Sequence, residues 1–146
     1  MKHIFLDTNI LVDHCFRRKA ANDPSLELIR RCQQRELIAY SAPWCIMTVM
    51  YLMDQARDEK DKRMLSKERI MAEAGLMLSF ITLIETNNAS FITAFTLGWS
   101  DWEDAVIHAM ANAHHKVEAI VTNDNGFMRR TKGLQGVKAL LPSQVM

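Results

Sequence analysis

Short apolar runs alternate along the chain with longer stretches in which apolar residues recur every three or four positions. Brief apolar runs bounded by polar residues are typical of strands buried in a parallel sheet, and the wider spacing is typical of amphipathic helices. The pattern predicts strands at residues 4–6, 37–40, 80–84, 119–121 and 137–141. It predicts helices at residues 9–16, from 24 onward, and at 44–53, 70–78, 91–97 and 101–114. The charged stretch 54–69, of mixed sign, predicts a solvated helix or helix–loop.

Strands that alternate with helices indicate βαβ units, so we predict an α/β fold: a three-layer α/β/α sandwich around a central parallel sheet. The length of 146 residues predicts a single domain over residues 1–146. No apolar stretch approaches the ~20 residues of a membrane span, and Asp7 interrupts any apolar segment of a signal peptide. The net charge of +1 leaves any nucleic-acid partner to a local basic face.

The cysteines are odd in number and far apart, without a CxxC motif: Cys15, Cys32 and Cys45. Such a set is typical of reduced core residues rather than of a disulfide or a zinc site. We therefore expect a cytoplasmic protein.

Acidic residues follow two of the predicted strands and begin one of the predicted helices. Asp7 comes directly after the first strand, and Asp124 comes after the fourth. Parallel strands end at the same edge of a sheet, where ligands bind in open α/β folds. The helix that begins near Asp101 runs antiparallel to the strand it precedes, so its first turn, with Asp104, faces the same edge. His108 shares that helix face. We expect these acids to converge.

Converging carboxylates repel one another unless a cation neutralises them. A hard divalent ion such as Mg²⁺ prefers oxygen ligands, and a carboxylate-held ion supports in-line displacement at phosphorus. Candidate donors that would orient the acids are Thr8, Asn9, Thr122 and Asn123. In the alternative interpretation each acid is only a helix or turn cap. That alternative predicts carboxyl groups more than ~10 Å apart, well beyond the reach of one ion whose ligands lie at ~2.0–2.1 Å.

Three segments resemble the best-marked segments of PIN-domain ribonucleases: FLDTNILVD (Phe5–Asp13), DWEDAVIHAMA (Asp101–Ala111) and IVTNDNGF (Ile120–Phe127). The LDTN run is the most specific, and the closing KALLPSQV resembles the last strand and tail of that fold, so the resemblance covers the whole chain. It implies a metal-dependent endoribonuclease that uses Mg²⁺ or Mn²⁺ to cut RNA. Many small single-domain bacterial members are toxins of toxin–antitoxin pairs and are often dimers, which implies an antitoxin partner and a homodimer.

The residues that match the family acids, and that the resemblance implies are catalytic and metal-binding, are Asp7, Asp104 and Asp124. Asp101, one helical turn earlier, is an additional candidate ligand. The family usually has a Glu in the helix after the second strand, but Met47 or Thr48 stands there in this chain. Three alternatives follow: Thr48 supplies a neutral or water-mediated ligand, Asp101 compensates, or the domain binds RNA or protein with weak or lost catalysis.

Basic residues follow the first and the last acid-bearing segments: Arg17, Arg18 and Lys19, then Arg129, Arg130 and Lys132. They are candidate contacts for RNA phosphates, and solvated loops are the alternative. The tryptophans, which are candidates for stacking on bases, are Trp44, Trp99 and Trp102. Core or subunit-interface positions are the alternative for them.

Overall fold

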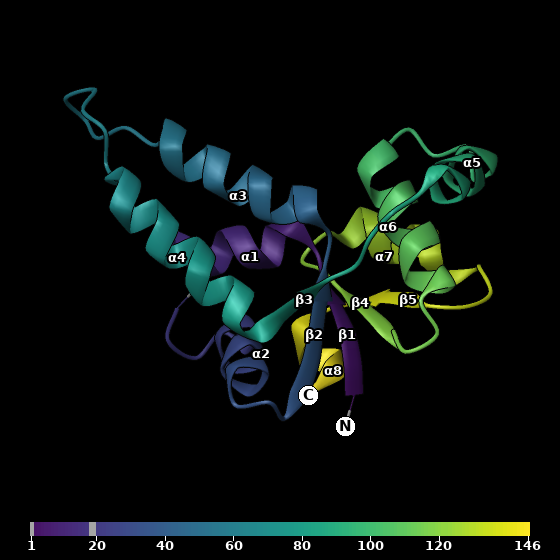
Figure 1. Ribbon diagram of the computed structural model, residues 1–146. Coiled ribbons are helices and arrows are strands. Elements are labelled where there is room, and N and C mark those ends of the chain that lie inside the picture. Colours follow the sequence, from purple (N-terminus) through teal and green to yellow (C-terminus); the bar gives the residue numbers. More distant parts are fainter. Residues whose placement is uncertain (1, 18–19) are drawn as a thin grey trace.

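The computed structural model describes residues 2–17 and 20–146, in which helices cover both sides of a five-stranded sheet (Figure 1). The strands are β1 (Lys2–Leu6), β2 (Leu37–Ser41), β3 (Ile81–Leu83), β4 (Ala119–Val121) and β5 (Lys138–Leu140). Their order is β3-β2-β1-β4-β5, and every neighbouring pair is parallel. The predicted α/β/α sandwich is confirmed, and each predicted strand lies within two residues of its observed ends.

The helices flank the sheet in two groups, α1 to α4 on one side and α5 to α7 on the other (Figure 1). Their bounds are α1 (Thr8–Cys15), α2 (Pro24–Gln33), α3 (Pro43–Gln55), α4 (Lys67–Phe80), α5 (Asn88–Thr96), α6 (Trp102–Ala113), α7 (Asn125–Lys132) and α8 (Pro142–Val145). The sequence pattern predicted neither α7 nor α8. The polar run 122–126 has the composition of a turn, yet Asp124 caps a helix there.

The central strand β1 determines where the sheet can hold a site. Its residues Ile4, Phe5 and Leu6 are fully buried, because β1 pairs with β2 on one edge and β4 on the other. The chain adds strands outward from β1 to β3 in one direction and from β4 to β5 in the other. The strand order therefore reverses between β1 and β4, and the crevice beyond their carboxyl ends is the expected ligand position.

Helices α3 and α4 pack against each other, and the loop that joins them lies away from the sheet (Figure 1). We call residues 43–80 the α3–α4 arm. An antiparallel bridge between Arg57 and Arg63 narrows its loop, and the Ser66 hydroxyl accepts from the Arg69 N–H to cap α4. The predicted helix–loop over 54–69 is thus confirmed. Within the described part of the chain, no helix is both long and apolar enough for a bilayer crossing.

Candidate metal centre

Six acidic side chains line one cleft of about 310 Å³ at the carboxyl ends of β1 and β4. They are Asp7, Asp13, Asp101, Glu103, Asp104 and Asp124. We call this the acid cleft. It lies at the switch point of the sheet because Leu6 and Val121 are paired neighbours, and the Asp7 N–H donates to the Val121 carbonyl at 3.0 Å. This pairing brings together two acid-bearing segments that are far apart in the sequence.

Three of these acids begin the three helices that start at the cleft. Asp7 accepts from the Thr8 N–H at 2.7 Å to cap α1. Asp101 accepts from the Asp104 N–H at 3.0 Å to cap α6, and Asp124 accepts from the Gly126 N–H at 2.6 Å to cap α7. Capping therefore describes the local bonding of these acids correctly. It does not keep them apart, because all three helices point their N-termini at one cleft.

Oxygen atoms of Asp101, Asp104 and Asp124 lie within 4.8 Å of one another. A divalent cation binds oxygen ligands at about 2.0–2.6 Å, so ligands across one ion are about 4–5 Å apart. Three carboxylate oxygens at this spacing match both the chemistry and the size of a Mg²⁺ or Mn²⁺ site. These three acids, all predicted from the sequence as metal ligands, fit such an ion.

Asp7 lines the same cleft in a different environment. It is 4% exposed, and its second carboxylate oxygen accepts from the Thr122 hydroxyl and the Asn9 amide, each at 2.7 Å. Burial raises the pKa of Asp7 to about 6, and the charges of Glu103 and Asp124 add to the rise, whereas the bonds from Thr122 and Thr8 oppose it. Asp7 thus lies on the wall of the cleft, outside the group of three.

The hydroxyl of Thr122 connects the two acid-bearing segments. It donates to Asp7, and it accepts from the Asn9 amide at 2.9 Å and from the Asp124 N–H at 3.0 Å. Asn9 in turn accepts from the Asn123 N–H, and the Asn123 amide donates to Asp13. The predicted orienting residues Asn9, Thr122 and Asn123 therefore form one continuous network, which holds β1 and β4 in register at the cleft.

Thr8, a predicted orienting residue, and Thr48, a predicted neutral or water-mediated ligand, differ in their position relative to the cleft. Thr8 lines the cleft, and its hydroxyl donates to Glu103 at 2.8 Å. Thr48 lies half-buried on α3 and is not among the side chains that line the acid cleft in the described part of the chain.

Asp104 is buried against Arg130, which donates to its carboxylate. The same guanidinium lies 4.0 Å from an oxygen of Asp124 and 5.3 Å from the centre of the Trp99 ring. Burial, followed by the charges of Asp101 and Asp7, raises the pKa of Asp104 to about 7 even though Arg130 opposes the shift. Burial and like charges together thus outweigh the guanidinium of Arg130 in setting this pKa.

The predicted RNA contacts are dispersed by the fold. Arg130 lies at the acids, whereas Arg129 lines a separate hollow beside β5. Arg17 lines a hollow between α1 and the α3–α4 arm, and Arg18 and Lys19 lie outside the described residues. Lys132 lines the same hollow as Arg129.

Two further residues of α6 lie at or near the cleft. Glu103, which is not among the residues predicted above, lines the cleft. Its position next to Asp104 in the first turn of a helix aimed at the strand ends was the available signal. His108 lies behind the cleft: it is buried, its ring contacts Trp99 at 5.5 Å, and Asn112 bonds to it at 3.2 Å. Burial lowers the pKa of His108.

Comparison with known families now adds to this geometry. The family model described as "PIN domain" matches residues 3–126. The chain belongs to the PIN-domain family. The matched residues include all six acids of the cleft, and the predicted family membership is confirmed.

Among solved structures, this PIN domain is similar to a chain in the crystal structure of VapBC2 from Rickettsia felis bound to a DNA fragment from their promoter. The TM-score is 0.65 at 15% sequence identity, and the alignment covers 94% of this chain and 98% of that chain. At this identity the similarity establishes the shared fold. No curated protein sequence matches significantly.

Proposed function

We propose that this PIN domain is an endoribonuclease that hydrolyses RNA phosphodiester bonds with Mg²⁺ or Mn²⁺. The observation that carries the proposal is the group Asp101, Asp104 and Asp124, whose oxygens share the spacing of a single ion at the switch point of the sheet. Asp7 completes the proposed catalytic set from the neighbouring strand.

In this proposal, the three grouped acids hold the ion. When bound, a divalent ion supplies a water activated as a nucleophile and offsets charge on the phosphoryl oxygens. The chain's own residues position that chemistry. Thr122 and Asn9 fix the Asp7 carboxylate by donating to it, and Thr122 also accepts from the backbone of Asp124. This network keeps Asp7, which follows β1, and Asp124, which follows β4, at a fixed separation.

Asp101 and Glu103 are the residues that we propose offset the absent family Glu. Met47 and Thr48 stand in its place on α3, but α6 contributes Asp101, Glu103 and Asp104 to the cleft from its cap and first turn. Half of the six acids of the cleft therefore come from α6 and its cap, and none of the six comes from α3.

We further propose a toxin–antitoxin setting, with RNA as the substrate, an antitoxin as the partner and a homodimer as the assembly. The VapBC2 complex named above supports this setting only through its fold. A second candidate is a PIN domain that binds RNA or protein without cutting it. The observation that favours it is that Thr48, at the family's Glu position, lies outside the side chains that line the acid cleft in the described part of the chain.

The test combines calorimetric titration of Mn²⁺ with incubation of a structured RNA in Mn²⁺ or in EDTA. Wild type, Asp104→Asn and Glu59→Gln are compared, because Glu59 is an exposed acid in the loop of the α3–α4 arm. We expect Asp104→Asn to lose metal binding and to cut RNA at least roughly 100-fold more slowly, the scale for removing a preorganised electrostatic group. Glu59→Gln should behave as wild type.

The remaining outcomes separate the alternatives. Mn²⁺ binding by wild type without RNA cleavage would favour the binding function. Absence of Mn²⁺ binding in a correctly folded wild type would contradict the metal centre itself.

A further inference from the structure

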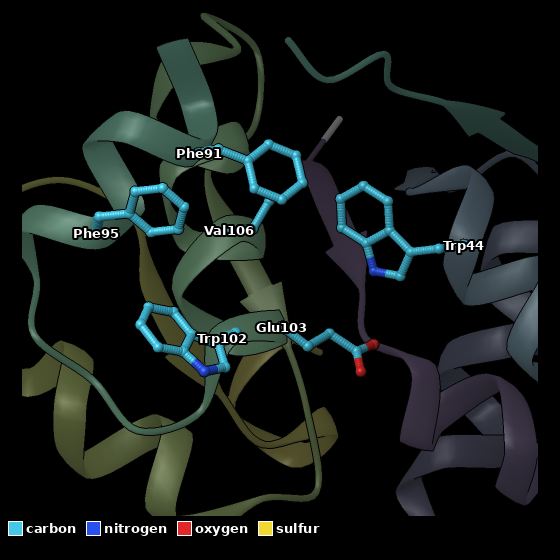
Figure 2. Close-up of a pocket in the computed structure, with 6 residues that line it drawn as sticks. All are labelled: Trp44, Phe91, Phe95, Trp102, Glu103 and Val106. Atoms are coloured by element: carbon cyan, nitrogen blue, oxygen red, sulfur yellow. The ribbon is translucent and has the colours of Figure 1, made fainter. Parts of the chain in front are cut away.

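An aromatic pocket of about 370 Å³ lies beside the acid cleft (Figure 2). Its walls come from α3, α5 and α6, and its lining residues are Trp44, Phe91, Phe95, Trp102, Glu103 and Val106. We call it the aromatic pocket. Figure 2 shows aromatic side chains from the three helices around one opening, with the Glu103 carboxylate at its side.

Three of the four aromatic side chains in this pocket are exposed to solvent, and the fourth, Trp44, is half-buried. Trp102 is 62% exposed, Phe95 is 55% exposed and Phe91 is 43% exposed. Their rings also fix one another: Phe95 meets Trp102 at right angles with centroids 5.7 Å apart, and Phe91 meets Phe95 edge-on at 6.4 Å. A cluster of exposed rings held in place by their neighbours is typical of a binding surface rather than of scattered surface apolar residues.

The pocket and the acid cleft share a wall. Glu103 lines both, and Trp102 stands in the chain between Asp101 and Glu103, two acids of the cleft. The aromatic pocket is therefore next to the place where the phosphate of a substrate would lie at the acids. We infer that the pocket binds a nucleobase of single-stranded RNA, next to the phosphodiester at the acid cleft. This inference rests on the proposed function and adds to it the group that positions the substrate.

The chemistry of the lining favours a base over other parts of a nucleic acid. Among the residues that line the pocket, the one charged group is the Glu103 carboxylate, which repels phosphate. A nucleobase is flat and uncharged, and it stacks on aromatic rings with a gain that does not depend on its sequence identity. The sugar–phosphate chain would then leave the pocket toward the metal site, where cationic charge compensates it.

The experiment measures the binding of a fluorescein-labelled single-stranded RNA of about 12 nucleotides by fluorescence anisotropy in Ca²⁺, an oxygen-binding ion that neutralises the acids, and a denaturing gel checks that the RNA stays intact. Trp102→Ala should weaken binding roughly 5- to 150-fold, the range for the loss of one base stack. Trp102→Phe should retain most of the affinity, because it keeps an aromatic face. Tyr51→Ala is the matched control, since Tyr51 is an equally exposed aromatic on α3 outside the pocket.

Two further measurements keep this result interpretable. Circular dichroism and thermal melting check that Trp102→Ala folds, which its exposure predicts. Mn²⁺ titration should be unchanged in Trp102→Ala, because that residue is not a ligand. If wild type binds RNA through Trp102 but never cuts it, the proposed hydrolysis fails while the base site stands.

Other outcomes would overturn the base site. One is RNA affinity equal in Trp102→Ala and wild type, or no RNA binding by wild type at all. Another is a wild-type dimer in sedimentation that becomes a monomer in Trp102→Ala with unchanged RNA affinity per chain. That result would assign the pocket to a second copy of the chain.

Discussion

The acid cleft and the α3–α4 arm are both rich in charged residues, but their charges are arranged in opposite ways. In the arm, acids and bases alternate at the surface and pair with each other: Asp54 with Arg63, and Glu73 with Arg69, each at 2.5 Å. In the cleft, six acids face one space, two of them are buried, and Arg130 pairs with Asp104.

This difference shows that sign and burial, rather than the number of charges, indicate a functional site. Paired surface charges neutralise one another and contribute little to stability. Like charges gathered in a buried place raise each other's pKa and are stabilised by an added cation. Burial is the main cause of the raised pKa values of Asp7 and Asp104, and the charges of neighbouring acids add to both.

The largest expected effect is the pH dependence of the metal-free protein. Asp7 and Asp104 have pKa values of about 6 and about 7, above the ordinary 3.8. Between pH 4 and 7 these two carboxyls therefore hold more protons in the folded state than in the unfolded state, so their contribution to the free energy of unfolding falls as pH rises. We expect a fall of about 1.4 kcal/mol per pH unit for each carboxyl between its two pKa values.

Thermal melts in EDTA from pH 4 to 8 measure this slope. Saturating Mn²⁺ should reduce or reverse it, because the ion favours the ionised carboxylates. Asp7→Asn should remove one carboxyl's share. Equal pH slopes in wild type and Asp7→Asn would contradict the electrostatic description of the cleft.

The next largest effect is expected from Thr122→Val, which keeps the side-chain shape and removes the hydroxyl that links Asp7, Asn9 and Asp124. Loss of a group that orients ligands typically costs 10- to 100-fold in metal affinity. Mn²⁺ calorimetry checks this. Thr131→Val is the control: Thr131 is also fully buried, but its hydroxyl bonds to α7 and β5 backbone away from the acids. Equal Mn²⁺ affinity in both variants would show that the network does not serve the metal.

A smaller change is expected from Arg130→Gln. The guanidinium competes with a metal ion for the same carboxylates, so its removal should strengthen Mn²⁺ binding severalfold while it lowers the stability of the metal-free protein. Arg129→Gln, at the exposed neighbouring position, should change neither quantity. Weaker Mn²⁺ binding in Arg130→Gln would mean that the arginine supports the site rather than competing for it.

The smallest effect should come from the arm. Arg63→Ala breaks an ion pair whose two side chains are 46% and 43% exposed. We expect the free energy of unfolding to change by less than about 1 kcal/mol, and Mn²⁺ affinity to stay constant. Urea denaturation and calorimetry measure both. A large loss of stability or of Mn²⁺ affinity in Arg63→Ala would contradict the contrast between paired surface charges in the arm and unneutralised acids in the cleft.

Those parts of the fold and site that depend on local pattern were predictable from the sequence. The apolar run Ile4–Leu6 could only be a buried strand, and parallel topology then placed Asp7 and Asp124 at one edge. Glu103 was not singled out, because acids in the first turn of a helix are common for electrostatic reasons alone.

Helix α7 was missed for a different reason. Its first turn contains Asn125 and Gly126, residues typical of turns. In the structure, Gly126 leaves room for the cap of α7, because a Cβ at this position would lie 3.0 Å from the Asp124 carboxylate. Because α7 was not predicted, the contact between Arg130 and Asp104 was not predicted either.

The pairing of β1 with β4 has a consequence for when the site can appear. Residues near position 7 meet their partners near position 121 only after β4 has been made. Contacts so distant in sequence form slowly, and during synthesis the N-terminal strand must wait for β4 to emerge from the ribosome. The nascent chain therefore carries Asp7 without its Thr122 and Asp124 neighbours, and the complete cleft forms only after β4 and the residues that follow it have been made.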